Sequence, residues 1–323
     1  MLDRTIRQVV DQVNADAAWP LVEAFSTMPR WKPEDVEASA HDIARRLTAL
    51  GVPVDLLEAS LYLSIPYEAS VEAGGETLAS KPPAYSTLCP EGLTGVLHHI
   101  PGTLSANVSS FYEKNRDEAA AAADRIRGKI VLTDGFASPN KVLEFQEKGA
   151  IGVIAVNPGI DRHWGICSSI WGTPDLDDLP RKPTIPVAVV NNPDGHKLIE
   201  LAKSGGSATI RTRLEEGWFK SLVPVVNVTG AIEPDKFVLL AGHYDSWDVG
   251  VGDNATGDAA LLEIARLLWH NRDKLRRSVR IAWWPGHSTG RYAGSAWFAD
   301  AFALDLDENC VAQVNCDSPG CRW

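Results

Sequence analysis

Residues 236–270 read KFVLLAGHYDSWDVGVGDNATGDAALLEIARLLWH. They begin with a continuous apolar stretch, Phe237–Gly242, which stops at His243. A turn rich in glycine follows, and beyond Asp253 the apolar residues recur at helical spacing. A near-continuous apolar strand followed by a helix with one apolar face is typical of a parallel sheet covered by helices. The apolar face of this helix consists of Leu261, Leu262, Ile264, Ala265, Leu268 and Trp269.

Two further apolar strands follow. Val279–Trp284 is followed by Pro285, Gly286 and His287, and Val311–Cys316 is followed by Asp317. Strand, helix and strand in this order predict an α/β sheet in residues 226–323, with the three strands side by side.

The ends of these strands carry polar side chains of one chemical kind. In an open α/β sheet, ligands bind outside the carboxyl ends of the strands. Imidazoles and carboxylates that meet at one edge form a site for a divalent metal, with zinc as the first choice. The residues delivered there are His243, Asp245, Asp253, His287, Ser288 and Asp317.

Each of these residues also has an ordinary structural explanation. Asp253 precedes a helix and could be its N-cap, and Asp317 precedes Ser-Pro-Gly and could begin a turn. His243 could be a histidine with its hydrogen bonds satisfied inside the fold. On the pattern alone, a metal site and separate structural roles remain equally open.

The remainder of the chain divides into recognisable segments. Residues 1–50 predict two amphipathic helices, the second beginning near Pro33 and ending at Gly51, and residues 54–74 predict a strand pair. Prolines, serines and glycines increase in number from Pro82 to about residue 108, which indicates a domain crossing. Residues 128–216 alternate strand and helix patterns on a short period. We therefore predict domains at 1–105, 106–225 and 226–323.

The composition of the chain disfavours several classes of partner and location. The chain has 323 residues, 31 basic and 42 acidic, and a net charge of −11, which disfavours nucleic acid and anionic membranes as partners. No apolar run reaches the roughly 18 residues of a membrane span, and the first residues lack the apolar core of a signal peptide. Five irregularly spaced cysteines favour reduced thiols over a disulfide framework. A cytoplasmic location is the prediction.

The segment GHYDSWDVGVGDNATGDAALLEIARLL, continued by RRSVRIAWWPGHSTGRYAGSAWFAD and VNCDSPG, resembles the zinc exopeptidase family that includes bacterial aminopeptidases, glutamate carboxypeptidase II and the transferrin receptor. GKIVLTDG, KGAIGVIAVN and IPVAVVNNPDGHKLIE resemble the protease-associated domain of the carboxypeptidase branch. The resemblance covers most of the chain from about Gly128. It implies a phosphorylase/aminopeptidase-like mixed sheet with flanking helices, plus an inserted β-rich protease-associated domain.

The resemblance also implies roles for individual residues. His243 and Asp317 would be ligands of the first metal, and Asp253 would bridge two metals. Asp245 would hold the imidazole of His243 by a hydrogen bond. Family members often have a cis peptide bond at the position of Asp253–Asn254.

The sequence departs from the family at the second metal. His287 and Ser288 stand where family members carry a Glu-Glu pair, and the chain stops at Trp323, before the family's last histidine ligand. One metal site is thus complete and the second is in doubt. His287 could be a general base, since an imidazole titrates near neutral pH, or a nitrogen ligand of a mononuclear site, or it could pack against Trp284 or Tyr292. His287, Ser288 and Asp245 are the candidate catalytic residues.

These observations lead to one functional prediction with two alternatives. We expect a metal-dependent hydrolase that cleaves a C–N bond in a small or peptide-like substrate, with zinc as cofactor. The alternatives are a non-catalytic binding or scaffold subunit and a non-hydrolytic enzyme such as a lyase. A second polypeptide that completes the catalytic domain, in a hetero-oligomer, is also expected.

Overall fold

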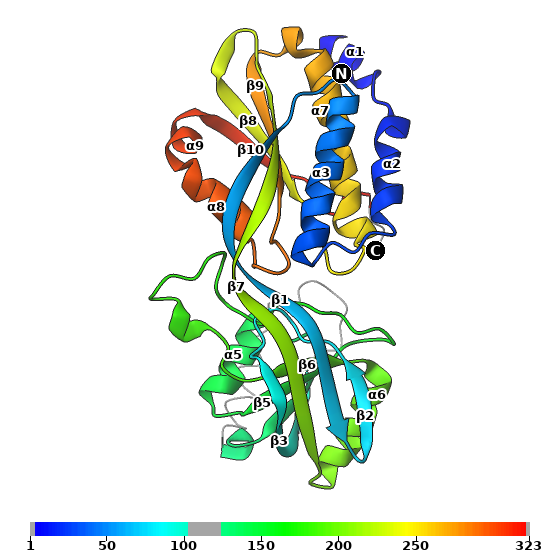
Figure 1. The fold of residues 1–323 in the computed structure, drawn as a ribbon, viewed down its shortest axis with the longest axis vertical. Helices are drawn as coiled ribbons and strands as arrows, with labels where there is room; N and C mark the ends of the chain where they lie inside the picture. The colour runs from blue at the N-terminus through cyan, green and yellow to red at the C-terminus, as the bar shows by residue number, and fades with distance from the viewer. Residues whose placement is uncertain (1–3, 103–123, 321–323) are drawn as a thin grey trace. The chain divides into compact units, whose positions relative to one another are not determined.

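The computed structural model describes residues 4–102 and 124–320, and it divides the chain into two compact units (Figure 1). Unit 1 comprises Met1–Leu61, Trp218–His287 and Tyr292–Trp323, and unit 2 comprises Tyr62–Gly217 and Ser288–Arg291. Two long strands, β1 (Asp55–Ala73) and β7 (Ser207–Val228), run through both units.

The sheet of unit 1 has the strand order β10-β8-β9-β7. Strand β8 (Glu233–His243) lies between β9 (Arg277–Trp284) and β10 (Cys310–Asn315), and both neighbours are parallel to it. Strand β7 pairs antiparallel with β9, so the sheet is mixed. The three predicted strands are therefore adjacent and parallel, and the predicted fold class is confirmed.

Helices cover this sheet on two sides (Figure 1). The helices α1 (Arg4–Val10), α2 (Ala15–Phe25), α3 (Pro33–Ala49) and α7 (Thr256–His270) lie together on one side. The helices α8 (Ala293–Ala301) and α9 (Ala303–Asn309) lie on the other. The prediction of two helices in residues 1–50 is wrong, because the described part of this segment contains α1, α2 and α3. Helix α2 begins separately from α1, since the Asn14 side chain caps it by accepting the Asp16 N–H.

The core of unit 1 forms between the sheet and the helices of the first group. It includes Phe25, Ile43, Leu47, Leu262 and Trp283, all with no exposed surface. Burying one such side chain contributes about 1.5–3 kcal/mol. This packing holds the strand ends of unit 1 in place.

Unit 2 contains a second parallel arrangement, in the order β3-β4-β5-β6, with β3 also paired antiparallel to β7. The strands are β3 (Cys89–Ile100), β4 (Ile130–Asp134), β5 (Gly152–Val156) and β6 (Val187–Val190). Its described helices include α5 (Pro139–Glu147) and α6 (Asn192–Lys203). The strand and helix alternation predicted for this segment is present.

The first strand of unit 2 corrects another prediction. Residues 54–74 do not contain a strand pair: β1 is one strand of 19 residues, and it pairs with β2 (Glu76–Ser80) and with β7. The turn falls at Gly74 and Gly75, whose φ angles are +60° and +84°. Positive φ at both central residues suits a two-residue hairpin turn, and glycine adopts it without steric cost.

The compact units begin and end at other residues than the predicted domains 1–105, 106–225 and 226–323, which stay a prediction. Unit 2 begins at Tyr62, not near residue 106, because β1, β2 and β3 pair with one another or with β7. The change in composition after Pro82 therefore lies inside unit 2.

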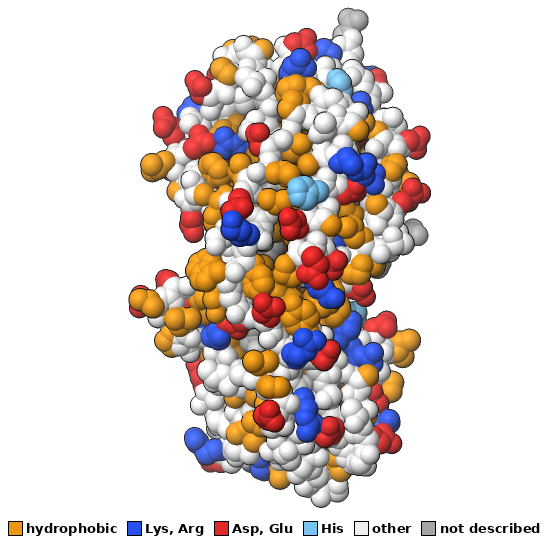
Figure 2. All heavy atoms as spheres, viewed as in Figure 1, with side chains coloured by type: hydrophobic (Ala, Val, Ile, Leu, Met, Phe, Trp, Pro, Cys, Tyr) orange, Lys and Arg blue, Asp and Glu red, His pale blue; other side chains and the backbone are white. Residues whose placement is uncertain are grey.

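Surface and membrane properties can be stated for the described part of the chain. Acidic and basic side chains are interspersed over the face drawn in Figure 2. Among the described helices, none combines the length and apolar character that a membrane span requires. The four cysteines within the described ranges are all free thiols.

Candidate metal centre

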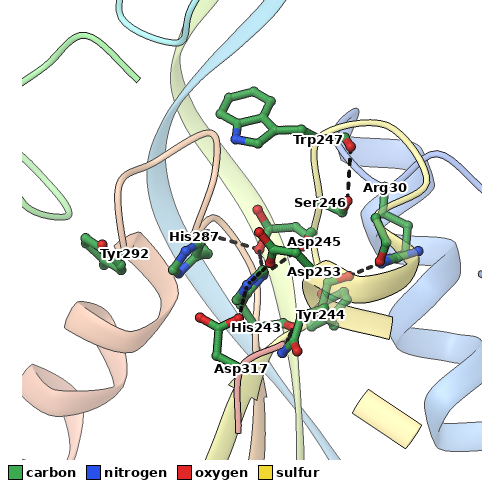
Figure 3. A network of polar contacts seen from close by, with 12 residues as sticks. Arg30, His243, Tyr244, Asp245, Ser246, Trp247, Asp253, His287, Tyr292 and Asp317 are labelled. Carbon is green, nitrogen blue, oxygen red and sulfur yellow. Dashed lines mark hydrogen bonds and ion pairs between the residues drawn. The ribbon is translucent and has the colours of Figure 1, made fainter. Parts of the chain in front are cut away.

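The carboxyl ends of β8, β9 and β10 meet at one edge of the unit 1 sheet (Figure 3). His243 is the last residue of β8, His287 follows β9, and Asp317 follows β10. One potential ligand atom from each of the three lies within 4.8 Å of the other two. Asp253 reaches the same place from the short helical turn η3 (Val251–Ala255) before α7. The structure thus brings the four predicted metal ligands together.

The contacts of the buried His243 imidazole indicate what the site can hold. Nε2 of His243 lies 2.9 Å from Oδ1 of Asp253 and 3.5 Å from Oδ1 of Asp317. Among the described residues, however, this nitrogen has no partner in a hydrogen-bonding direction. A buried nitrogen without a hydrogen bond, next to two carboxylate oxygens, matches the donor set that a divalent metal requires. The residues present therefore fit a metal ion.

The other nitrogen of His243 is fixed by the main chain. Nδ1 lies 2.8 Å from the backbone carbonyl oxygen of Asp245, whereas the Asp245 carboxylate is 4.0 Å away. When the ring is neutral, as a metal ligand must be, a hydrogen bond from Nδ1–H to this carbonyl leaves the lone pair on Nε2, facing Asp253 and Asp317. The predicted orientation of His243 by Asp245 thus comes from the carbonyl, not from the carboxylate.

The carboxylate of Asp245 has a different partner. It is fully buried, and its Oδ1 accepts the backbone N–H of His287 at 3.0 Å. One residue therefore orients the side chain of His243 and the main chain of His287.

The imidazole of His287 lies between two aromatic rings. It stacks on His243 with centroids 3.8 Å apart and planes 8° apart, and the Tyr292 ring meets it at 4.6 Å and 85°. Burial, together with the positive charge on His243, lowers the pKa of His287 to about 3. The neutral ring of His287 keeps a nitrogen lone pair. The structure places His287 both against Tyr292 and near the ligand atoms of His243 and Asp317.

The charges of the site act on one another. Burial opposes protonation of His243, but the carboxylates of Asp253, Asp317 and Asp245 outweigh it and raise its pKa well above the ordinary value. Contact with the His243 imidazole, 3.5 Å away, lowers the pKa of Asp317 to about 2. The site thus attracts positive charge.

The catalytic role of Ser288 stays a prediction. Its side chain is buried, and Ser288–Arg291 group with unit 2. Among the described residues, His243, His287 and Asp317 form a group that could hold a metal ion.

Asn254 joins the strand ends, and sequence reasoning missed it. The peptide bond Asp253–Asn254 is cis, as the resemblance implies. Nδ2 of Asn254 donates to the carbonyls of His243 and Cys316, both at 2.9 Å, and its Oδ1 accepts the Ser318 N–H at 2.9 Å. The end of β8 and the segment after β10 are therefore tied through one fully buried side chain.

Fold and site together define an α/β protein with a candidate divalent-metal centre at the carboxyl ends of three parallel strands. Residues 225–322 match the model of Peptidase family M28, and residues 96–198 match the PA domain. Residues 225–322 are thus similar to an M28 peptidase domain and residues 96–198 to a PA domain, which confirms the resemblance seen in the sequence.

Individual relatives agree with this assignment. Carboxypeptidase Q of Mus musculus is 25% identical over 241 residues, which are 70% of this chain and 50% of that protein. Aminopeptidase NAALADL1 of Mus musculus is 35% identical over 120 residues, 36% of this chain and 16% of that protein. The chain spans about half the length of the carboxypeptidase Q relatives that it matches.

Solved structures share the fold. A Peptidase M28 precursor from Shewanella amazonensis matches with a TM-score of 0.74 and 19% identity. The match covers 96% of this chain and 72% of the Shewanella chain. BSAP, a zinc aminopeptidase from Bacillus subtilis, has a TM-score of 0.69 and 21% identity, with 96% and 70% covered.

Proposed function

We propose that this chain is a metal-dependent hydrolase that cleaves a C–N bond, in an amide or peptide-like small substrate. The observation that carries the proposal is the buried Nε2 of His243, which faces the carboxylates of Asp253 and Asp317 without a hydrogen bond within the described residues. The similarity to carboxypeptidase Q and to aminopeptidase NAALADL1 supports the same reaction class.

Zinc is the metal we propose for this site. His243, Asp253 and Asp317 would hold it, and the zinc aminopeptidase from Bacillus subtilis supports the choice. When bound, zinc would polarise a substrate carbonyl as a Lewis acid and lower the pKa of water. The Asp253 side chain is 64% exposed, so the site is open to solvent and to a small substrate.

His287 is proposed as the fourth ligand of a mononuclear site. One of its nitrogens lies within 4.8 Å of ligand atoms of His243 and Asp317, and the Asp245 carboxylate fixes its main chain. The alternative is that His287 is a general base beside the metal. The two roles differ in one measurable way, because only the ligand role makes metal content depend on His287.

The experiment compares metal content and hydrolysis in a set of histidine variants. The purified chain is loaded with zinc, dialysed and analysed for metal, and then assayed with aminoacyl and peptidyl arylamides. One zinc per chain is expected, lost in His243→Ala and retained in His196→Ala, whose histidine is exposed on α6. Loss of zinc in His287→Ala supports the ligand role, whereas retained zinc without turnover supports the base. A wild-type chain that never binds metal contradicts the proposal.

A binding subunit in a hetero-oligomer is the second candidate. Strand β10 is the edge of the sheet, and its Val311 and Val314 are 50% and 53% exposed. An apolar groove of about 410 Å³ runs between β10 and the helices α8 and α9. Exposed apolar edges pair readily with other strands. A second polypeptide on this edge would give a larger mass in light scattering, which Val311→Lys would reduce.

A further inference from the structure

Arg30 is a fully buried arginine in the segment between α2 and α3, far along the chain from the metal ligands. Its guanidinium group donates hydrogen bonds only to backbone carbonyls among the partners described (Figure 3). Nε donates to Tyr244 at 2.8 Å, Nη1 to Val249 at 2.6 Å and to Phe25 at 3.2 Å, and Nη2 to Gly250 at 3.1 Å. Three of these carbonyls belong to the loop between β8 and α7.

The main chain of Arg30 binds the same loop. The Arg30 N–H donates to the carbonyl of Asp248 at 3.0 Å, and the Arg30 carbonyl accepts the N–H of Ser246 at 2.8 Å. One residue thus contacts Tyr244, Ser246, Asp248, Val249 and Gly250, which are five of the seven residues in 244–250.

A buried cation is costly unless its surroundings compensate it. Burial lowers the pKa of Arg30, and the nearby carboxylates of Asp258, Asp245 and Asp253 raise it in opposition. The ring of Phe25 also lies 4.2 Å from the guanidinium carbon, a favourable contact for a cation. A guanidinium offers five N–H donors in a fixed fork, which a lysine cannot reproduce.

The loop that Arg30 holds carries the orienting groups of the metal centre. The carbonyl of Asp245 fixes His243, and its carboxylate fixes the main chain of His287. The loop then leads through Gly250, where a Cβ would lie 1.7 Å from Ser246 Oγ and 2.2 Å from the carbonyl of Asp253. Without the guanidinium, three carbonyls of this tight loop would lose their donors, and the loop would have to change shape.

We propose that Arg30 is a positioning residue of the metal centre, which holds the 244–250 loop in the conformation that directs His243 and Asp253 at a shared cation. The expected effect of Arg30 on metal binding rests on the proposed metal-dependent function. Its effect on the loop itself does not require a metal.

The test replaces Arg30 with lysine and uses Arg266→Lys as the matched control. Arg266, also in unit 1, binds Glu263 and the Gln12 carbonyl, away from the metal centre. We expect backbone amides of residues 245–252 to exchange with deuterium at least about tenfold faster in Arg30→Lys without metal, because their loop opens more readily. Zinc affinity, measured by chelator competition, should fall about 10- to 100-fold. Arg266→Lys should change neither quantity.

The outcomes separate this inference from the proposed function. If the exchange rates of the 245–252 amides and the zinc affinity of Arg30→Lys both equal those of the wild type, Arg30 has no positioning role. If the wild type binds no zinc, the proposed function fails, and the exchange of the 245–252 amides alone decides the role of Arg30.

A milder variant covers the case in which Arg30→Lys does not fold. Phe25→Leu keeps an apolar side chain but removes the ring beside the guanidinium, and Leu47→Ala is a core control on α3. In Phe25→Leu we expect faster exchange confined to the 245–252 amides and weaker zinc binding, whereas Leu47→Ala should speed exchange across the core without singling out this loop or weakening zinc binding. Equal behaviour of the two variants would overturn the proposal.

Discussion

Replacing Asn254 with alanine would remove all three hydrogen bonds that its side chain makes with His243, Cys316 and Ser318. The side chain is fully buried, so water cannot replace the lost partners without a change in the fold. At about 1 kcal/mol for each net hydrogen bond, and more for a buried group left unpaired, the free energy of unfolding should fall by about 3 kcal/mol. The loss should be larger than that of an ordinary surface substitution.

Urea denaturation followed by tryptophan fluorescence measures this change. Asn227→Ala is the matched control, because Asn227 is exposed and its side chain accepts one hydrogen bond from Arg280. The control should change the free energy of unfolding by less than about 0.5 kcal/mol. A change below about 1 kcal/mol in Asn254→Ala would refute the assignment of Asn254 as the link between β8 and the segment after β10.

Three further substitutions test the packing and charges of unit 1. Gly257→Ala should destabilise the chain in urea although alanine favours helices, because its Cβ would lie 2.1 Å from Asn254 Oδ1 and 2.6 Å from the Cys316 carbonyl; a gain in stability would contradict this. Leu262→Ala should cost about 2–5 kcal/mol in the same assay, since Leu262 is fully buried in the core; a cost under about 1 kcal/mol would show that the site repacks. Burial opposes ionisation of Glu263, but hydrogen bonds from Arg266 and the Asn14 N–H lower its pKa. Its stabilisation is therefore present above the pKa of the unfolded chain and is lost as pH falls through the lower folded value, so Glu263→Gln should flatten the acid side of the stability–pH profile.

The strands and ligands of unit 1 could be predicted because local patterns determine them. Strand β8 and its neighbours are apolar runs that each stop at a polar residue, and parallel strands deliver such residues to one edge. His243, Asp253 and Asp317 therefore converge in the structure as the sequence predicted.

The contacts that orient these ligands could not be predicted in the same way. Arg30 precedes Tyr244 by 214 positions, and its neighbours STMPRWKPED have the composition of a loop before a helix. The roles of the Asp245 carbonyl and carboxylate depend on backbone conformation, which residue type does not determine. The boundary between Leu61 and Tyr62 could not be predicted, because it lies inside β1, where the composition of the chain does not change.

The metal centre thus depends on two kinds of information in the sequence. Sheet topology places the ligand-bearing residues near one another, but it does not fix the ring of His243 or the main chain of His287. Those orientations come from Asp245, whose loop is held by a residue outside the sheet. A chain with the three strand-end ligands alone could therefore gather imidazole and carboxylates at one edge without directing their lone pairs at a common point. Metal affinity, more than folding, should report the difference.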